Sequence, residues 1–201
     1  MLITFEGIDG SGKSTQIQLL KTFIEANLGR NVVVYREPGG NIVSEKIRSL
    51  LLDTDFEIQP VTEMLLFSAA RAQLVADDVM PNLKNGSIVI LDRFYDSTTA
   101  YQGYGRGAAP INEIHALNHF AALGLKPDVT FYLRLDLEEA QLRRSGDEKD
   151  RMERSGNAFY EKVIQGFDEM AKQESRFCVL DASLSKEEIH RLITEKVVSL
   201  L

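Results

Sequence analysis

The sequence predicts an α/β domain in which a parallel five-stranded sheet is flanked by helices. Short apolar runs rich in β-branched residues alternate with longer helical patterns along the 201 residues. Several of these runs are hydrophobic continuously rather than at every second residue, which is typical of strands covered on both faces, as in a parallel sheet. No repeat or low-complexity linker divides the chain, so we expect residues 1–201 to form one domain.

Each expected element has its own sequence signal. The expected strands are the apolar runs 2–6, 31–35, 87–91, 129–135 and 176–180. The first helix follows from the spacing of Ile17, Leu20 and Ile24, which places these side chains on one helical face. Such patterns predict helices over 14–27, 43–52, 61–80, 97–103, 111–123, 137–144, 157–173 and 186–199. Residues that interrupt regular structure mark the boundaries, namely Gly29, Pro60, Gly86, Pro110 and Pro127.

The composition argues against several classes of protein. The formal net charge is -7 at pH 7, which argues against a nucleic acid or an anionic membrane as the main partner. Cys178 is the only cysteine, so no internal disulfide can form and a reducing compartment is favoured. The sequence shows no long apolar span and no signal peptide at its start. We therefore expect a cytoplasmic protein.

Residues 7–14, GIDGSGKS, fit the phosphate-binding loop pattern GxxxxGK[ST]. The loop lies between an expected strand and an expected helix, which is the context that this pattern requires. Its backbone N–H groups would point at phosphate oxygens, Lys13 would reach the β- and γ-phosphates, and the Ser14 hydroxyl would ligate Mg²⁺. The residues that would hold the nucleotide are Gly7, Ile8, Asp9, Gly10, Ser11, Gly12, Lys13, Ser14 and Thr15.

A second group of polar residues follows the third expected strand. Asp92 ends this strand, the usual place for an acid that holds Mg²⁺ or its water opposite the phosphate loop, although a turn aspartate is the alternative. Arg93 could offer a bidentate fork to a second phosphate. Two phosphate-binding groups indicate an acceptor that is itself phosphorylated. Its phosphate, with a second pKa near 6, is an anion at pH 7 and needs no general base.

Residues 143–154 are dense in arginine and allow two interpretations. The stretch is either a solvated helix end of mixed charge or a short mobile lid, about 143–156, that brings arginines over the transferring phosphoryl group. Gly146 and Gly156 would permit hinging of such a lid.

Two further pairs of residues share a helical face because they are four positions apart. Phe67 and Arg71 would suit a nucleobase, one by stacking and one by donating hydrogen bonds, but the pattern alone favours a core phenylalanine and a surface arginine. His115 and His119 could grip a metal. Ala116 stands where the glutamate of HExxH would be, so a solvated face is favoured.

Several segments together resemble the bacterial thymidylate kinases, which belong to the P-loop nucleoside monophosphate kinases. The resemblance covers residues from the N-terminus to about 170, in the expected order. The segments are FEGIDGSGKSTQ at 5–16, REPGG at 36–40, EKIRSLLL at 45–52, LLFSAARAQ at 65–73, DRF at 92–94, DSTTAYQGYGRG at 96–107 and DRME at 150–153. The resemblance implies transfer of a phosphoryl group from ATP to dTMP, with Mg²⁺, by a homodimer.

The resemblance also implies roles for individual residues. Arg93 would hold the acceptor phosphate, Phe67 would stack on thymine, and Arg71 would donate to its O4 edge. Tyr101 would crowd a 2′-hydroxyl, and Arg151 in the lid would clamp the phosphoryl group. The remaining implied site residues are Arg36, Glu37, Pro38 (after a cis bond), Arg48, Ser97 and Gln102 on the substrate side, with Arg143 on the ATP side.

Two alternative functions remain open from the sequence. One is a kinase of another nucleoside monophosphate on the same fold. The other is a nucleotide-dependent switch, which in a GTPase would need an NKxD element and a DxxG element after the loop. The nearest candidate, at 125–128, is LKPD and lacks the asparagine.

Overall fold

The structure is a computed structural model that describes residues 1–55, 57–144, 151 and 155–201. Its centre is a sheet of five parallel strands in the order β2-β3-β1-β4-β5. The strands are β1 (Leu2–Glu6), β2 (Val32–Arg36), β3 (Ile88–Asp92), β4 (Val129–Arg134) and β5 (Phe177–Asp181). The predicted parallel five-stranded sheet is confirmed, with strand boundaries within one residue of the predicted ones.

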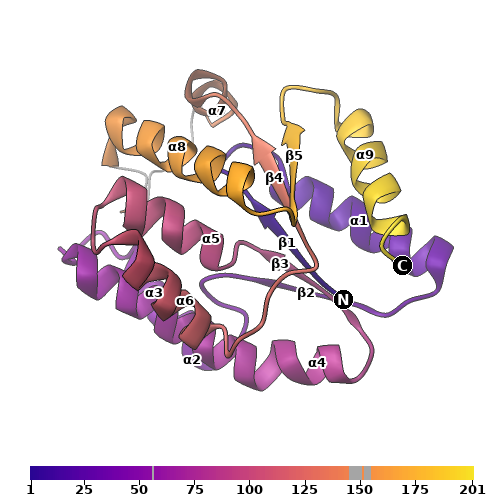
Figure 1. The fold of residues 1–201 in the computed structure, drawn as a ribbon, viewed down its shortest axis with the longest axis horizontal. Helices are drawn as coiled ribbons and strands as arrows, with labels where there is room; N and C mark the ends of the chain where they lie inside the picture. The colour runs from indigo at the N-terminus through magenta and orange to yellow at the C-terminus, as the bar shows by residue number, and fades with distance from the viewer. Residues whose placement is uncertain (56, 145–150, 152–154) are drawn as a thin grey trace.

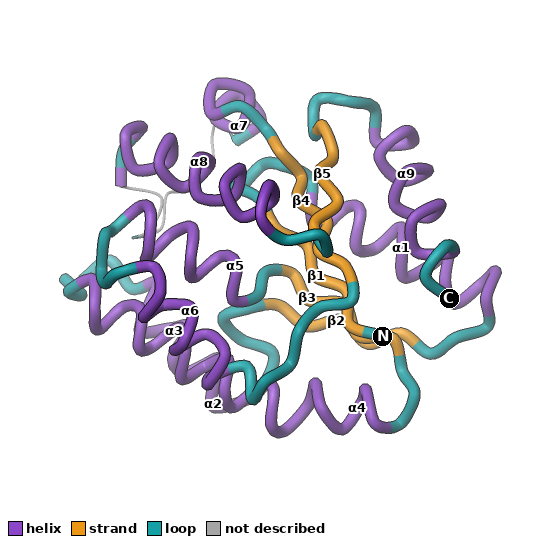
Figure 2. The backbone as a smooth tube through the Cα atoms, viewed as in Figure 1, coloured by secondary structure: helices purple, strands orange, loops and turns teal. Residues whose placement is uncertain are grey.

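Helices cover both faces of this sheet (Figures 1 and 2). On one side lie α1 (Lys13–Leu28) and α9 (Lys186–Val198), which contact each other. The other helices are α2 (Ile42–Leu52), α3 (Pro60–Leu74), α4 (Met80–Lys84), α5 (Tyr95–Thr98), α6 (Ile111–Ala121), α7 (Leu137–Arg143) and α8 (Asn157–Gln173). Two π-helical turns, η1 (Val75–Val79) and η2 (Thr99–Gly105), continue α3 and α5.

The helix predicted for 61–80 extends further than the sequence indicated. It runs through η1 into α4 and ends at Lys84. Pro81 lies directly after the predicted end, and in a straight α-helix a proline ring clashes with the carbonyl of residue i−4. In the structure the wider π-turn of η1 precedes Pro81, which occupies the first turn of α4. Proline is tolerated in that position.

The central strand explains why the sheet needs two helical layers. Every residue of β1 is buried, from Leu2 to Glu6. Ile3 and Phe5 pack into one hydrophobic cluster, whereas Leu2 packs into a second cluster with Leu91. The continuous hydrophobicity of this strand therefore reflects burial on both faces.

The topology brings distant polar segments together. Because all five strands are parallel, their carboxyl ends share one edge of the sheet. β1 has β3 on one side and β4 on the other, so the chain connections diverge at β1, where open α/β sheets bind ligands. The loop 7–12, the turn 36–40 and residues 92–93 all lie at this edge.

The described residues include no helix with both the length and the hydrophobicity that a membrane span requires.

Candidate active site

The loop between β1 and α1 has a backbone that depends on glycine. Gly7 adopts φ 135°, and a Cβ atom there would lie 2.6 Å from the carbonyl oxygen of Leu133 on the neighbouring strand. Gly12, at φ 91°, provides the left-handed residue at which α1 begins. The sequence pattern thus produces the tight loop and helix start that phosphate binding requires.

Lys13 lies inside this loop. Its Nζ donates hydrogen bonds to the carbonyl oxygens of Gly7 and Ile8, each at 3.0 Å, and lies 4.0 Å from the Asp9 carboxylate. Burial lowers the pKa of Lys13 to about 8, and the charge of Arg93 acts in the same direction. The ammonium group is therefore in a setting where an added anion would be stabilised.

Ser14 and Asp92, the two predicted metal ligands, are in contact. The Ser14 hydroxyl donates to Asp92 Oδ2 at 3.1 Å. The described residues contain no group of three or more His, Cys, Asp or Glu side chains that could hold a metal ion. A hydroxyl and one carboxylate fit Mg²⁺, which usually takes few protein ligands and completes its octahedron with phosphate oxygens and water.

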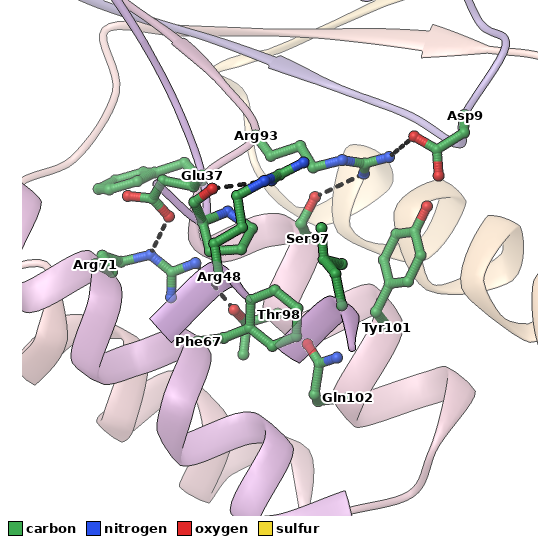
Figure 3. Close-up of a pocket in the computed structure, with 13 residues that line it drawn as sticks. Asp9, Glu37, Arg48, Phe67, Arg71, Arg93, Ser97, Thr98, Tyr101 and Gln102 are labelled. Atoms are coloured by element: carbon green, nitrogen blue, oxygen red, sulfur yellow. Dashed lines mark hydrogen bonds and ion pairs between the residues drawn. The ribbon is translucent and has the colours of Figure 1, made fainter. Parts of the chain in front are cut away.

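Arg93 takes an unusual backbone conformation at the end of β3. Its φ is 70°, in the left-handed region. Nη2 donates to Asp9 Oδ1 at 2.6 Å and Nη1 donates to Ser97 Oγ at 3.1 Å, while the guanidinium carbon lies 5.1 Å from the centre of the Tyr101 ring (Figure 3). Burial alone would lower the pKa of Arg93, but the nearby Asp9, Tyr101 and Asp92 raise it well above its usual value. Arg93 is therefore a permanent cation with a defined orientation.

Two adjoining pockets meet at this arginine. Both are lined by Asp9, Glu37, Arg48 and Arg93. The first pocket, drawn in Figure 3, is further lined by Pro38, Leu52, Phe67, Arg71, Phe94, Ser97, Thr98, Tyr101 and Gln102. The second is further lined by Gly10, Gly12, Lys13, Ser14, Thr15, Arg36, Asp92, Arg143 and Arg144. One pocket thus has apolar and aromatic walls, and the other contains the phosphate loop and most of the cations.

The structure overturns the pattern-based preference for a surface arginine at position 71. Arg71 is 2% exposed, and both Arg71 and Phe67 line the first pocket. The guanidinium donates from Nε to Glu37 Oε2 at 2.8 Å and from Nη2 to Thr98 Oγ1 at 3.0 Å. Nη1 donates to Asn118 Oδ1 at 3.3 Å. Helical spacing could not show this burial, because all three partners come from other segments.

Comparisons with known proteins agree with this geometry. Residues 5–193 match the family model described as thymidylate kinase. A thymidylate kinase of Chlorobium luteolum is 50% identical over 206 residues, which cover 97% of this chain and 95% of the relative. One of Chlorobaculum tepidum is 48% identical and covers 100% of this chain and 98% of the relative. The crystal structure of thymidylate kinase from Ehrlichia chaffeensis aligns with a TM-score of 0.78, at 35% identity, over 98% of each chain.

The chain belongs to the thymidylate kinase family. The resemblance inferred from the sequence motifs is confirmed. The fold of the solved relative also agrees with the five-stranded parallel sheet of this chain.

Within this family framework, the charged turn after β2 contributes the expected site residues Arg36, Glu37 and Pro38, and Arg48 of α2 contacts this turn. The Glu37–Pro38 peptide is cis, as the resemblance implies. Glu37 is buried, and this burial raises its pKa to about 7 although the Arg71 charge lowers it. Arg48 donates to the Pro38 carbonyl oxygen at 2.9 Å and lines both pockets. Arg36 lines the second pocket only, and it pairs with Glu45 at 3.3 Å.

The arginines of the expected lid occupy different places. Arg143 and Arg144 line the second pocket, and Arg143 also pairs with Glu139 at 3.0 Å. Arg151 forms an ion pair with Glu63 at 2.6 Å and donates to the Leu51 carbonyl oxygen at 2.8 Å. The rest of the expected lid, residues 145–150 and 152–154, lies outside the described residues.

His115 and His119 are both exposed on α6, as the sequence favoured.

Three buried polar residues near the site escaped the sequence analysis. Glu63 accepts from Gln102 Nε2 at 2.9 Å and pairs with Arg106 at 3.4 Å as well as with Arg151. A signal for Glu63 existed, because it shares the helical face of residues 67 and 71 at intervals of four. The other two are Asn118, behind Arg71, and Glu6, at the end of β1. Burial and the charge of Asp96 raise the pKa of Glu6 above its usual value, and the hydrogen bonds from Ser97 and Phe94 and the charge of Arg93 oppose this shift.

The Arg71–Glu37 pair should stabilise the fold far more than an exposed pair. We expect Arg71→Met to reduce the free energy of unfolding by about 3–5 kcal/mol, because it leaves a buried carboxylate without its cation. Arg36→Met is the matched control, since its pair with Glu45 is exposed and should contribute at most about 1 kcal/mol. Urea unfolding at pH 7 measures both values. Equal losses in the two variants would contradict this interpretation of the pair.

Proposed function

We propose that the chain transfers the γ-phosphoryl group of MgATP to the 5′-phosphate of dTMP, giving dTDP, the precursor of dTTP, and ADP. The observation that carries this proposal is the position of Arg93 where the two pockets meet. One pocket contains the phosphate loop and the Ser14–Asp92 pair. The other contains an aromatic ring and a buried arginine, which suit a nucleobase. Two phosphorylated ligands would therefore meet end to end at a fixed cation.

The residues around the second pocket would bind ATP. The N–H groups of residues 7–15 would surround its phosphates, Lys13 would leave its two carbonyl partners for the β- and γ-phosphates, and Arg143 would flank the nucleotide. Mg²⁺, held by Ser14 and by Asp92 directly or through water, would neutralise charge on the phosphates. The family generally uses ATP with Mg²⁺, and the donor set at residues 14 and 92 suits that ion.

The transfer step needs alignment rather than a base. An oxygen of the dTMP phosphate forms a bond to the γ-phosphorus of ATP, and the bond from that phosphorus to the bridging oxygen breaks, so that ADP leaves with the electron pair. The attacking oxygen is already an anion at neutral pH, since the second pKa of a phosphate monoester is near 6. Arg93, with Arg36 and Arg48, would hold the acceptor phosphate in line and offset the repulsion between the two anions.

The first pocket would recognise the thymidine part of the acceptor. Phe67 would stack on the base and Arg71 would donate to its O4 atom, held in direction by Glu37. Tyr101 would crowd a 2′-hydroxyl, with Ser97 and Gln102 lining the sugar and base side. A cytosine amino group at the O4 position is itself a donor and would face a donor.

A substrate panel tests this function. We expect ADP release with dTMP. With dUMP we expect a rate only about fourfold lower, because the missing methyl group contributes about 0.8 kcal/mol. With dCMP we expect a rate lower by about 10⁴-fold, because two donors would face each other in a buried site. The same assay with dGMP and AMP tests the alternative of another monophosphate kinase. A dCMP rate equal to that of dTMP would contradict the assignment of Arg71, and GTP hydrolysis without an acceptor would favour a switch.

We further propose that Arg151 clamps the transferring phosphoryl group. In this role Arg151 would break its ion pair with Glu63 and bind phosphate oxygens, so one anionic partner would replace another. Arg151→Ala should lower kcat by about 10³-fold with little change in either KM, because the contact would form mainly in the transition state. Arg106→Ala is the control, since Arg106 also pairs with Glu63, and it should retain kcat within a few fold. An unchanged kcat in Arg151→Ala would remove Arg151 from this role.

The family function also leads us to propose a cytoplasmic homodimer that binds neither nucleic acid nor membranes. The net charge of -7 and the single cysteine support the cytoplasmic assignment. Apolar side chains are exposed on α2, α3 and α6, which lie side by side in Figures 1 and 2. Ile42 is 80% exposed and Phe120 is 77% exposed. Such a patch would be covered by a second copy of the chain.

Sedimentation velocity tests the proposed dimer. We expect a dimer at micromolar concentration and a monomer for Phe120→Asp, because a charge would be buried in the apolar contact. Val198→Asp is the control, since Val198 is half-exposed on α9 and away from this patch. A monomeric wild-type protein would refute the dimer.

A further inference from the structure

Glu6 is a buried carboxylate beneath the site, and none of the roles described above uses it. It is the last residue of β1, directly before the phosphate loop, and 0% of its surface is exposed. An ionisable group in the centre of a sheet costs free energy unless its partners compensate it. Its partners therefore indicate what the residue does.

Both oxygens of Glu6 bind the turn that follows β3. Oε1 accepts a hydrogen bond from the backbone N–H of Phe94 at 2.8 Å. Oε2 accepts from the hydroxyl of Ser97 at 2.6 Å. Both donors follow Arg93 in the sequence, at positions 94 and 97, so the carboxylate binds the turn from which Arg93 extends.

The first contact supports a costly backbone conformation. Arg93 has φ 70°, which is unfavourable for a residue with a Cβ atom. Its own N–H donates to the Phe5 carbonyl oxygen at 2.9 Å, and the next N–H, that of Phe94, donates to Glu6. Two consecutive amides are thus held by the end of β1, on both sides of the strained residue.

The second contact fixes the direction of a hydroxyl. Ser97 has one hydroxyl proton, and it donates this proton to Glu6 Oε2, which leaves its lone pairs to accept from Arg93 Nη1 at 3.1 Å. Without the acceptor on Glu6, the proton could turn toward the guanidinium and remove that contact. The carboxylate therefore controls one of the two hydrogen bonds that orient the Arg93 side chain; Asp9 accepts the other.

We propose that Glu6 is a positioning residue for the acceptor phosphate. It acts through the Phe94 amide and the Ser97 hydroxyl and sets the direction in which Arg93 presents its guanidinium. Glu6 itself touches neither substrate. This proposal rests on the proposed function, in which Arg93 holds the phosphate of dTMP.

The test compares ligands that differ only in that phosphate. Glu6→Gln keeps the shape and one acceptor oxygen but replaces the other with a donor that faces Ser97. Isothermal titration calorimetry should show about 10-fold weaker binding of dTMP, the fold-change that corresponds to one hydrogen bond to a charged group. Binding of thymidine should change by less than about twofold, because thymidine has no 5′-phosphate for Arg93 to hold.

Thr4→Val is the matched control. Thr4 is buried two residues earlier on β1, on the same side of the strand, and its hydroxyl contacts Thr130 at 2.8 Å. This variant loses a buried hydrogen bond in the same strand but not the contact with the turn. We expect it to lower the melting temperature without changing the ratio of the dTMP and thymidine dissociation constants.

Ser97→Ala removes the hydroxyl through which Glu6 would act and leaves the charge in the sheet unchanged. It therefore also tests the proposal if Glu6→Gln does not fold. It should weaken dTMP binding more than thymidine binding, although Ser97 also lines the first pocket. Adding Glu6→Gln should weaken dTMP binding much less than the two single effects multiplied, since both residues act through one contact. Unchanged dTMP binding in Ser97→Ala or in Glu6→Gln would overturn the proposal, as would equal weakening of dTMP and thymidine. A wild-type protein that binds thymidine but does not phosphorylate dTMP would instead overturn the proposed function.

Discussion

The contact between Arg93 and Asp9 is the interaction on which both halves of the site depend. Asp9 belongs to the phosphate loop and Arg93 to the end of β3, and their 2.6 Å ion pair joins the two pockets. Asp9 also lies 4.0 Å from Lys13, so one carboxylate sits beside both cations. The charges of Arg93 and Lys13 hold the pKa of Asp9 well below its usual range although burial opposes this shift. In the absence of phosphates, this carboxylate keeps two like charges close together.

The same arrangement recurs around the site and explains how an acidic chain forms a cationic centre. Buried carboxylates pair with arginines around the site: Glu37 holds Arg71, which lines the first pocket, and Glu63 holds Arg151. The net charge of the chain therefore does not indicate the local charge of the site. The whole chain has a net charge of -7, yet the second pocket is lined by one lysine and five arginines, namely Lys13, Arg36, Arg48, Arg93, Arg143 and Arg144. Each buried carboxylate also fixes a guanidinium in direction, which a solvated cation would not provide.

The sequence was sufficient for the elements and for the phosphate loop, because these depend on local pattern. Continuous apolar runs predicted the buried parallel strands, and glycine spacing predicted the loop, in which Gly7, Gly10 and Gly12 have positive φ angles. Contacts between segments that are distant in the sequence could not be predicted from local pattern. Arg71 looked like a surface residue because its partner Glu37 lies 34 positions away on another element. Nothing in the local pattern singles out Glu6, because only the fold brings the turn after β3 against it. The family motifs supplied part of what local pattern could not, since they assigned Arg71 to the substrate site but gave no role to Glu6.

The contacts of the two cations also indicate how the site distinguishes phosphorylated ligands from neutral ones. Lys13 donates to two backbone carbonyls and Arg93 to Asp9 and Ser97, so neither donor is unsatisfied before a ligand arrives. A neutral group would offer Lys13 only acceptors of the kind that it already has, and it would offer Arg93 a weaker acceptor than the Asp9 carboxylate. A phosphate oxygen carries charge, and charge-assisted hydrogen bonds are about twice as strong as neutral ones. Exchange is then favourable for an anion, and most favourable for one that lies between both cations. The charge of such an anion offsets the burial and the Arg93 charge that lower the pKa of Lys13. The junction of the two pockets is the place where a phosphoryl group in transfer between two nucleotides would lie.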